Sequence, residues 1–138
     1  MASSCVIKPR SMLPCTCIVY DHHGSKGRCV QSQASIKAGT TVFFDPVITF
    51  LGQTYKELKP VTDSGHSTIN AYAMRWTDMY DSIPLGLTAL MNHSRRPNCM
   101  IVNHLESGYK EVIALRNIKP NEELTIKYGC KLWFKEQK

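Results

Sequence analysis

Short runs of β-branched and apolar residues recur along this chain, and turn-forming residues separate them. Such runs are typical of strands, and their number predicts a mainly β domain. The runs span residues 15–20, 40–51, 99–105, 109–115 and 122–128. Asp45-Pro46 interrupts the second run and indicates a bend or a sheet edge, because proline cannot donate to a strand ladder. Glu106-Ser107-Gly108 separates the third and fourth runs and predicts a hairpin.

One segment has the spacing of a helix. Ser67 or Thr68 can cap its start, and Pro84 lies beyond its end. Apolar side chains at helical spacing follow the cap, at Ile69, Tyr72, Ala73 and Trp76. We therefore expect short antiparallel sheets together with one or two short helices.

The length of 138 residues suits one domain and is too small for two ordinary ones. We expect residues 15–138 to form that domain and residues 1–14 to be a loose N-terminal arm. No apolar run approaches the ~20 residues that span a bilayer, and the first residues lack the pattern of a signal peptide. We therefore expect an intracellular protein, nuclear or cytoplasmic and not secreted, with no membrane partner. Its six cysteines are then expected to be thiols.

The chain carries a formal net charge of +6. A net positive charge favours contact with nucleic acid or acidic proteins. It is also found in proteins in which it contributes only to solubility. Lysine and arginine are scattered except in residues 127–138, and aromatic residues do not interleave with them as a stripe. A weak nucleic-acid contact through the basic surface is thus one hypothesis, and it rests on charge only.

Four blocks of polar and glycine residues stand out from the strand pattern. The central block, Asn92-His93-Ser94-Arg95-Arg96-Pro97-Asn98, is by itself more typical of a polar turn between two strands. Upstream lie Gly24-Ser25-Lys26-Gly27-Arg28-Cys29 and the turn Ile36-Lys37-Ala38-Gly39, and downstream lies Glu122-Glu123-Leu124-Thr125-Ile126-Lys127-Tyr128-Gly129. The order and spacing of these blocks resemble those of the SET-domain protein lysine methyltransferases. The resemblance covers roughly residues 17–134, and in its shortness the chain is most similar to the minimal viral SET enzymes.

The resemblance implies a SET fold with a knot-like C-terminal crossing. It also implies transfer of a methyl group from S-adenosyl-L-methionine to a lysine ε-amine of a protein, with a histone tail as the first candidate. The substrate would be an extended peptide that adds to a sheet edge. The family motifs assign catalysis to Tyr128 and Tyr72. They assign cofactor binding to Lys26, Gly27, Arg28, Cys29, Asn92, His93 and Trp133.

The chemistry explains why these residue types are needed. Methyl transfer is an in-line displacement at a sulfonium methyl, so it needs two aligned molecules and neither a metal nor a protein nucleophile. The attacking lysine must be neutral, and its deprotonation at neutral pH costs roughly 4 kcal/mol. An apolar channel beside a sulfonium lowers that cost. A phenol with a pKa of about 10 is a poor base at neutral pH, so we expect Tyr128 to position the amine.

Simpler structural interpretations exist for the same residues. Tyr128 can be an ordinary tyrosine that closes a strand. Tyr72 and Trp133 can be core residues. Asn92 and His93 can tie chain segments together, and this role is compatible with cofactor binding.

The chain departs from the family pattern at two places. Cys29 stands where a second glycine is usual, which puts one cofactor contact in doubt. Arg95 and Cys130 stand where zinc-binding members carry cysteines and a cysteine cluster, so we predict no post-SET zinc module and no metal. A weaker alternative ligand set is Cys15, Cys17, His22 and His23. The departures keep open a second hypothesis, a catalytically inactive SET module that binds a peptide or scaffolds a partner.

Overall fold

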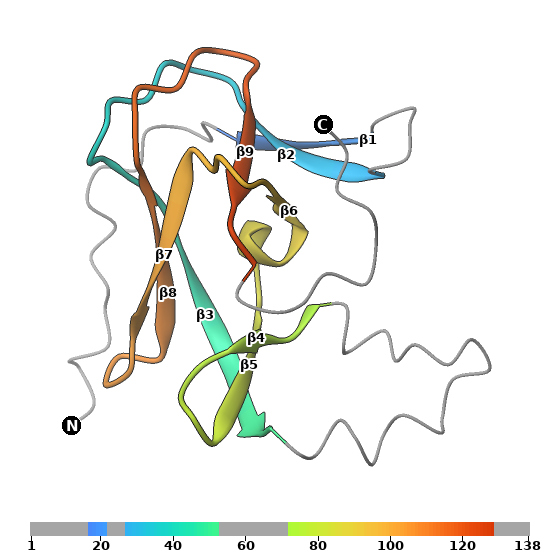
Figure 1. Ribbon diagram of the computed structural model, residues 1–138, viewed down its shortest axis with the longest axis vertical. Coiled ribbons are helices and arrows are strands. Elements are labelled where there is room, and N and C mark those ends of the chain that lie inside the picture. Colours follow the sequence, from blue (N-terminus) through green and yellow to red (C-terminus); the bar gives the residue numbers. More distant parts are fainter. Residues whose placement is uncertain (1–16, 22–26, 53–71, 129–138) are drawn as a thin grey trace, which may run out of the picture.

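The computed structural model describes residues 17–21, 27–52 and 72–128 of the chain (Figure 1). This part holds nine strands in two sheets and one short 3-10 helix, η3 (Leu87–Leu90). The strands are β1 (Cys17–Asp21), β2 (Arg28–Ser32), β3 (Thr41–Leu51), β4 (Met74–Arg75), β5 (Tyr80–Pro84), β6 (Asn92–His93), β7 (Cys99–His104), β8 (Tyr109–Ala114) and β9 (Glu123–Ile126). The prediction of a mainly β chain is confirmed.

The first sheet has the strand order β1-β2-β9-β6. The strand β9 lies antiparallel to β2 and parallel to β6, with Asn92 opposite Thr125 and His93 opposite Ile126. The last strand is therefore inserted between two strands from earlier parts of the chain. This is the arrangement that the expected C-terminal crossing requires.

The second sheet has the strand order β4-β5-β3-β8-β7, with the long strand β3 at its centre. The alternative of a sheet edge at Asp45-Pro46 is wrong, because β3 continues through both residues at the centre of its sheet. Pro46 lies where the pairing of β3 changes from β8 to β5, and its carbonyl oxygen accepts the N–H of Leu85 over 2.9 Å. The predicted hairpin is confirmed as β7 and β8, whose turn contains Gly108 at φ 73°.

The expected helix from Ser67 to Trp76 is wrong from Met74 onward, whereas Tyr72 is helical. Met74–Arg75 forms the strand β4, which pairs with Ser82 and Asp81 of β5. Pairing with β5 gives these two residues an extended backbone, although the apolar spacing of the segment favours a helix. Strand formation depends on the neighbouring strands more than on the intrinsic preference of the residues. The first half of that segment, up to residue 71, lies outside the described residues.

The hydrophobic core draws side chains from both sheets. Its buried members are Cys17, Val30, Ile36, Met91, Cys99, Val112, Ala114, Ile118, Leu124 and Ile126. Removal of this apolar surface from water favours the folded state by roughly 25 cal/mol per Å². Because β9 contributes Leu124 and Ile126, the core also fixes the strand that leads to Tyr128.

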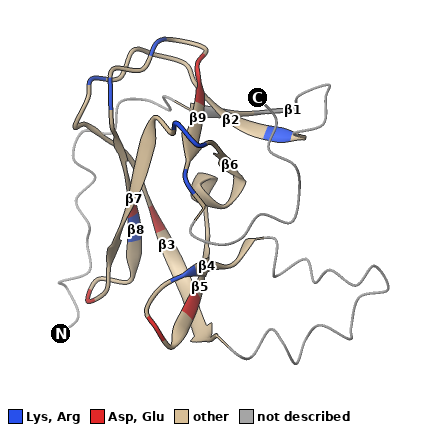
Figure 2. Cartoon of the chain, viewed as in Figure 1, with Lys and Arg blue, Asp and Glu red and all other residues tan. Residues whose placement is uncertain are grey.

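Positive charge is distributed over both sheets and their loops in the described part of the chain. Figure 2 shows lysine and arginine residues on strands and loops at separate places, with acidic residues among them. No helix among the described residues is long and apolar enough to cross a bilayer. A nucleic-acid contact gains no support from this distribution and stays a hypothesis.

Candidate active site

Tyr128 follows Lys127, the first residue after β9, and is held by two residues around β6. Its main-chain N–H donates to Nδ1 of His93 over 2.9 Å. Its hydroxyl group donates to the carbonyl oxygen of Met91 over 2.7 Å. The rings of His93 and Tyr128 lie 5.2 Å apart between centroids. The parallel pairing of β6 with β9 brings these residues together, and it fixes both ends of the tyrosine.

Asn92 connects three strands of the first sheet. Its side-chain nitrogen donates to the carbonyl oxygen of Arg28 over 2.9 Å and to Oε1 of Glu123 over 2.8 Å. Arg28 begins β2 and Glu123 begins β9. Because one amide nitrogen carries both contacts, Asn92 holds the start of β2 at a fixed place beside β9.

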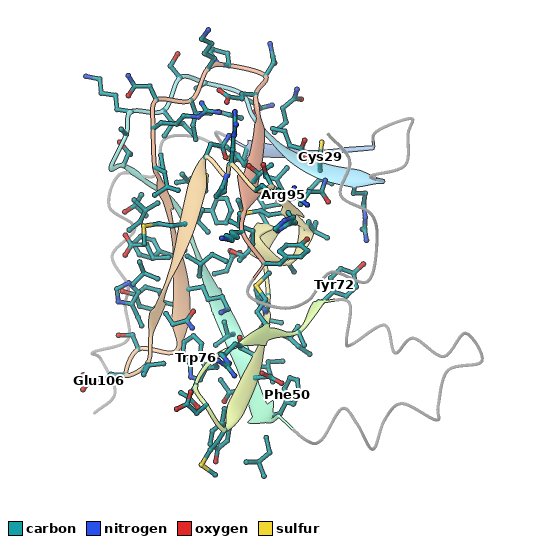
Figure 3. The ribbon with its side chains drawn as sticks, viewed as in Figure 1. Cys29, Phe50, Tyr72, Trp76, Arg95 and Glu106 are labelled. Atoms are coloured by element: carbon teal, nitrogen blue, oxygen red, sulfur yellow. The ribbon has the colours of Figure 1, made fainter. Side chains whose placement is uncertain are left out.

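Arg28 extends the site toward Tyr72. Its Nη2 atom donates to the hydroxyl oxygen of Tyr72 over 2.8 Å. Tyr72 lies just before β4 and its side chain is half-buried. Figure 3 shows Tyr72, Arg95 and Cys29 around β6 in the view. The two tyrosines that the sequence singled out are thus linked to the first sheet, Tyr72 through Arg28 of β2 and Tyr128 through His93 of β6.

Asn98 ends the central block, but its contacts with β9 were not predicted from the sequence. Its side chain is 2% exposed, its Nδ2 atom donates to the carbonyl oxygen of Glu123 over 2.7 Å, and its Oδ1 atom accepts the N–H of Thr125 over 2.8 Å. These are the bonds that a neighbouring strand would make. Asn98 therefore supplies main-chain partners to Glu123 and Thr125 of β9, the strand that precedes Tyr128.

Gly27 and Cys29 define the opening of the glycine block. Gly27 has φ 65°, a conformation that favours glycine, and no described atom lies within 4 Å of the place a Cβ would take. Cys29 is 1% exposed and belongs to β2, where any residue can adopt the extended backbone. The departure at Cys29 therefore costs the strand no strain, and its thiol is packed rather than open to solvent.

Several expected residues lie outside the described part of the chain. They are Lys26, Trp133, Cys130, Cys15, His22, His23 and the arm at residues 1–14. Of the alternative zinc set only Cys17 is described, and it is buried in the core. The contacts of Met91 and Glu123 were not foreseen. Glu123 stands in the downstream block and Met91 directly precedes the central block, so their place at the motifs was the available signal.

The chemistry of this donor set fits S-adenosyl-L-methionine. The molecule carries a carboxylate, an ammonium group, a sulfonium and an adenine. Arg28 offers an exposed guanidinium for the carboxylate, and no described atom fills the space beside the Gly27 backbone. The Asn92 amide is already fixed by two contacts, so its remaining oxygen is preorganised as an acceptor.

The chain is similar to known proteins in sequence and in fold. The SET domain family model matches residues 27–129. A Schizosaccharomyces pombe protein named histone-lysine N-methyltransferase, H3 lysine-37 specific, is 33% identical over 112 residues, which are 81% of this chain and 73% of that protein. A solved Plasmodium falciparum protein, provisionally named a histone methyltransferase, has a TM-score of 0.62 at 22% identity over 86% of this chain and 97% of its own. The chain therefore belongs to the SET-domain family of protein lysine methyltransferases.

Proposed function

We propose that this protein transfers a methyl group from S-adenosyl-L-methionine to a lysine side chain of a histone. The observation that carries the proposal is the double anchoring of Tyr128, by its N–H on His93 and by its hydroxyl group on Met91. An enzyme that aligns two molecules needs such fixed groups, since alignment alone lowers a barrier by several kcal/mol.

The hydrogen bond to Met91 determines what the Tyr128 hydroxyl can do. Its proton is donated to the carbonyl oxygen, so the phenolic oxygen faces an incoming amine as an acceptor. An amine N–H that donates to this oxygen has its nitrogen lone pair directed elsewhere, toward the methyl group. Tyr128 therefore acts by orientation of the nucleophile, and it need not remove a proton.

Cofactor binding falls to the residues on β2 and β6. We assign it to Gly27, Arg28, Asn92 and His93, with Cys29 as a packed neighbour, and we extend it by family analogy to Lys26 and Trp133. When bound, S-adenosyl-L-methionine supplies a methyl group on a positively charged sulfur that an amine can displace. The residues of this chain hold and orient it, and no metal takes part in the proposal.

Tyr72 is proposed as the second tyrosine of the lysine channel. Its hydroxyl oxygen accepts from the Arg28 guanidinium, which supports a place for Tyr72 next to the cofactor-binding strand. A positive group near the channel favours the neutral form of an entering lysine. This would reduce the roughly 4 kcal/mol needed to deprotonate lysine at neutral pH.

The histone substrate and a nuclear location are proposed from the fission-yeast relative. That protein is named as specific for lysine 37 of histone H3, and it is 33% identical to this chain over 112 residues. We propose an extended histone peptide as substrate without assigning the position of its lysine.

The test is methyl transfer onto core histones with radiolabelled S-adenosyl-L-methionine. The proposal predicts label on a histone band, and mass spectrometry should find the added methyl groups on lysine. Calorimetry should find cofactor binding in the same preparation. Cofactor and peptide binding without label would favour the inactive module. Neither label nor cofactor binding would overturn the assignment.

A further inference from the structure

A buried carboxylate outside the site lies against the segment that leads into it. Asp45 belongs to β3, in the middle of the second sheet, and is 7% exposed. Its Oδ2 atom accepts the main-chain N–H of Thr88 over 2.7 Å. A Cβ built on Gly86 would lie 2.2 Å from Oδ1 of Asp45. The carboxylate is thus packed directly onto the turn formed by Gly86 and η3.

The residues after this turn are those that hold Tyr128. The helix η3 ends at Leu90, Met91 follows with the carbonyl oxygen that accepts the Tyr128 hydroxyl, and β6 comes next. Asp45 therefore connects the second sheet to the strand of the first sheet that carries Asn92 and His93.

The contact between β3 and the turn before η3 depends on an aspartate at residue 45 and a glycine at residue 86. A carboxylate loses hydration when it is buried and needs hydrogen bonds in compensation. The Thr88 N–H provides one such bond, and glycine at residue 86 leaves room for the second oxygen. A side chain on residue 86 would have to displace either the carboxylate or the turn.

We propose that Asp45 is a positioning residue for the active site. It holds η3 so that the Met91 carbonyl group stands where the Tyr128 hydroxyl needs it. Asp45 acts through Met91 and touches neither of the reacting molecules. The inference rests on the proposed methyl transfer for its kinetic consequences, while its structural consequences can be measured without activity.

The kinetic arm compares Asp45→Ala with Asp45→Asn. Asp45→Ala removes the acceptor of the Thr88 N–H and should lower kcat about tenfold or more, because small displacements of catalytic groups are costly. The KM for the histone substrate should stay nearly unchanged. Asp45→Asn keeps an acceptor oxygen and should restore most of kcat. Asp81→Asn, on the neighbouring strand β5, is the control and should leave kcat unchanged.

A double variant tests the contact itself. Gly86→Ala should also lower kcat, because its methyl group meets the Asp45 carboxylate. In Asp45→Ala/Gly86→Ala that collision is absent, so the loss should be smaller than the product of the two single losses. If the kcat loss of the double variant equals the product of the two single losses, Asp45 and Gly86 do not act through the same contact, and the inference is overturned.

Hydrogen exchange provides the arm that needs no activity. In Asp45→Ala the N–H of Thr88 and peptides that cover Met91 to His93 should exchange faster, while the hairpin of β7 and β8 should keep its protection. If the wild type transfers no methyl group, the proposed function fails and this arm still decides the role of Asp45. Unchanged exchange in η3 and β6, or equal loss of kcat and stability in Asp45→Ala and Asp45→Asn, would overturn the inference.

Discussion

The hydroxyl group of Tyr128 donates a hydrogen bond to the carbonyl oxygen of Met91 over 2.7 Å. This single contact joins the end of β9 to the residue before β6, and it fixes the direction of the phenolic oxygen. The strand that leads to Tyr128 depends on Asn98, and Met91 follows the turn held by Asp45. The candidate site is therefore built from parts that can be tested separately.

Asn98→Ala should destabilise the protein by about 3 kcal/mol, because it removes two hydrogen bonds to partly buried main-chain groups of Glu123 and Thr125. Urea unfolding measures the change. The matched control is Asn117→Ala, since exposed Asn117 also accepts a main-chain N–H, from Ala38 over 2.9 Å. It should cost less than about 1 kcal/mol. Equal losses in the two variants would contradict the role given to Asn98.

Lys110 should make stability depend on pH in the alkaline range. Its side chain is 1% exposed, its Nζ atom donates to Oδ1 of Asn103 over 2.8 Å, and burial lowers its pKa to about 8. The unfolded chain keeps this proton up to a pKa of about 10.4. Between these values the unfolded state binds more protons, so the free energy of unfolding should rise with pH, by about 3 kcal/mol in total.

The comparison with Lys110→Met isolates this contribution. Urea unfolding at pH 7.5, 8.5 and 9.5, at about one-unit spacing across the window, should show the wild type gaining stability relative to the variant. Other groups that titrate in this range act equally on both proteins and cancel in the difference. Parallel pH curves would show that Lys110 keeps its ordinary pKa in the folded protein.

Cys99 should be chemically inert while the protein is folded. Burial raises the pKa of its thiol to about 12, and the neighbouring Cys17 adds to the effect. The thiolate is the reactive form, so alkylation at pH 8 should be about three orders of magnitude slower than in the urea-unfolded chain. Iodoacetamide labelling followed by peptide mass spectrometry measures it. Similar rates in the two states would mean that the Cys99 thiol is open to solvent.

Local sequence signals predicted the parts of the fold that depend on neighbours in the chain. The hairpin of β7 and β8 follows from two apolar runs around a glycine turn, and the last strand follows from strict alternation. The strand β4 could not be predicted in this way. Met74 and Arg75 owe their extended backbone to β5, and their own spacing favoured a helix.

The candidate site was predictable as far as its residues stood in recognised motifs. Arg28, Tyr72, Asn92, His93 and Tyr128 were named from the sequence, and the structure connects them by hydrogen bonds. Asp45 was not foreseen, because its partner Thr88 lies 43 residues away and neither residue belongs to a motif. Contacts between distant residues leave no periodic trace in a single sequence.

The most direct test of the central claim is methyl transfer by Tyr128→Phe beside the wild type. The variant lacks only the hydroxyl oxygen, so cofactor binding by calorimetry should persist, and the free energy of unfolding should change by no more than about 1.5 kcal/mol. Transfer of label to histones should fall about 100-fold or more. Tyr80→Phe, at an exposed tyrosine of β5, is the control and should keep full activity. Undiminished transfer by a folded Tyr128→Phe would contradict the account.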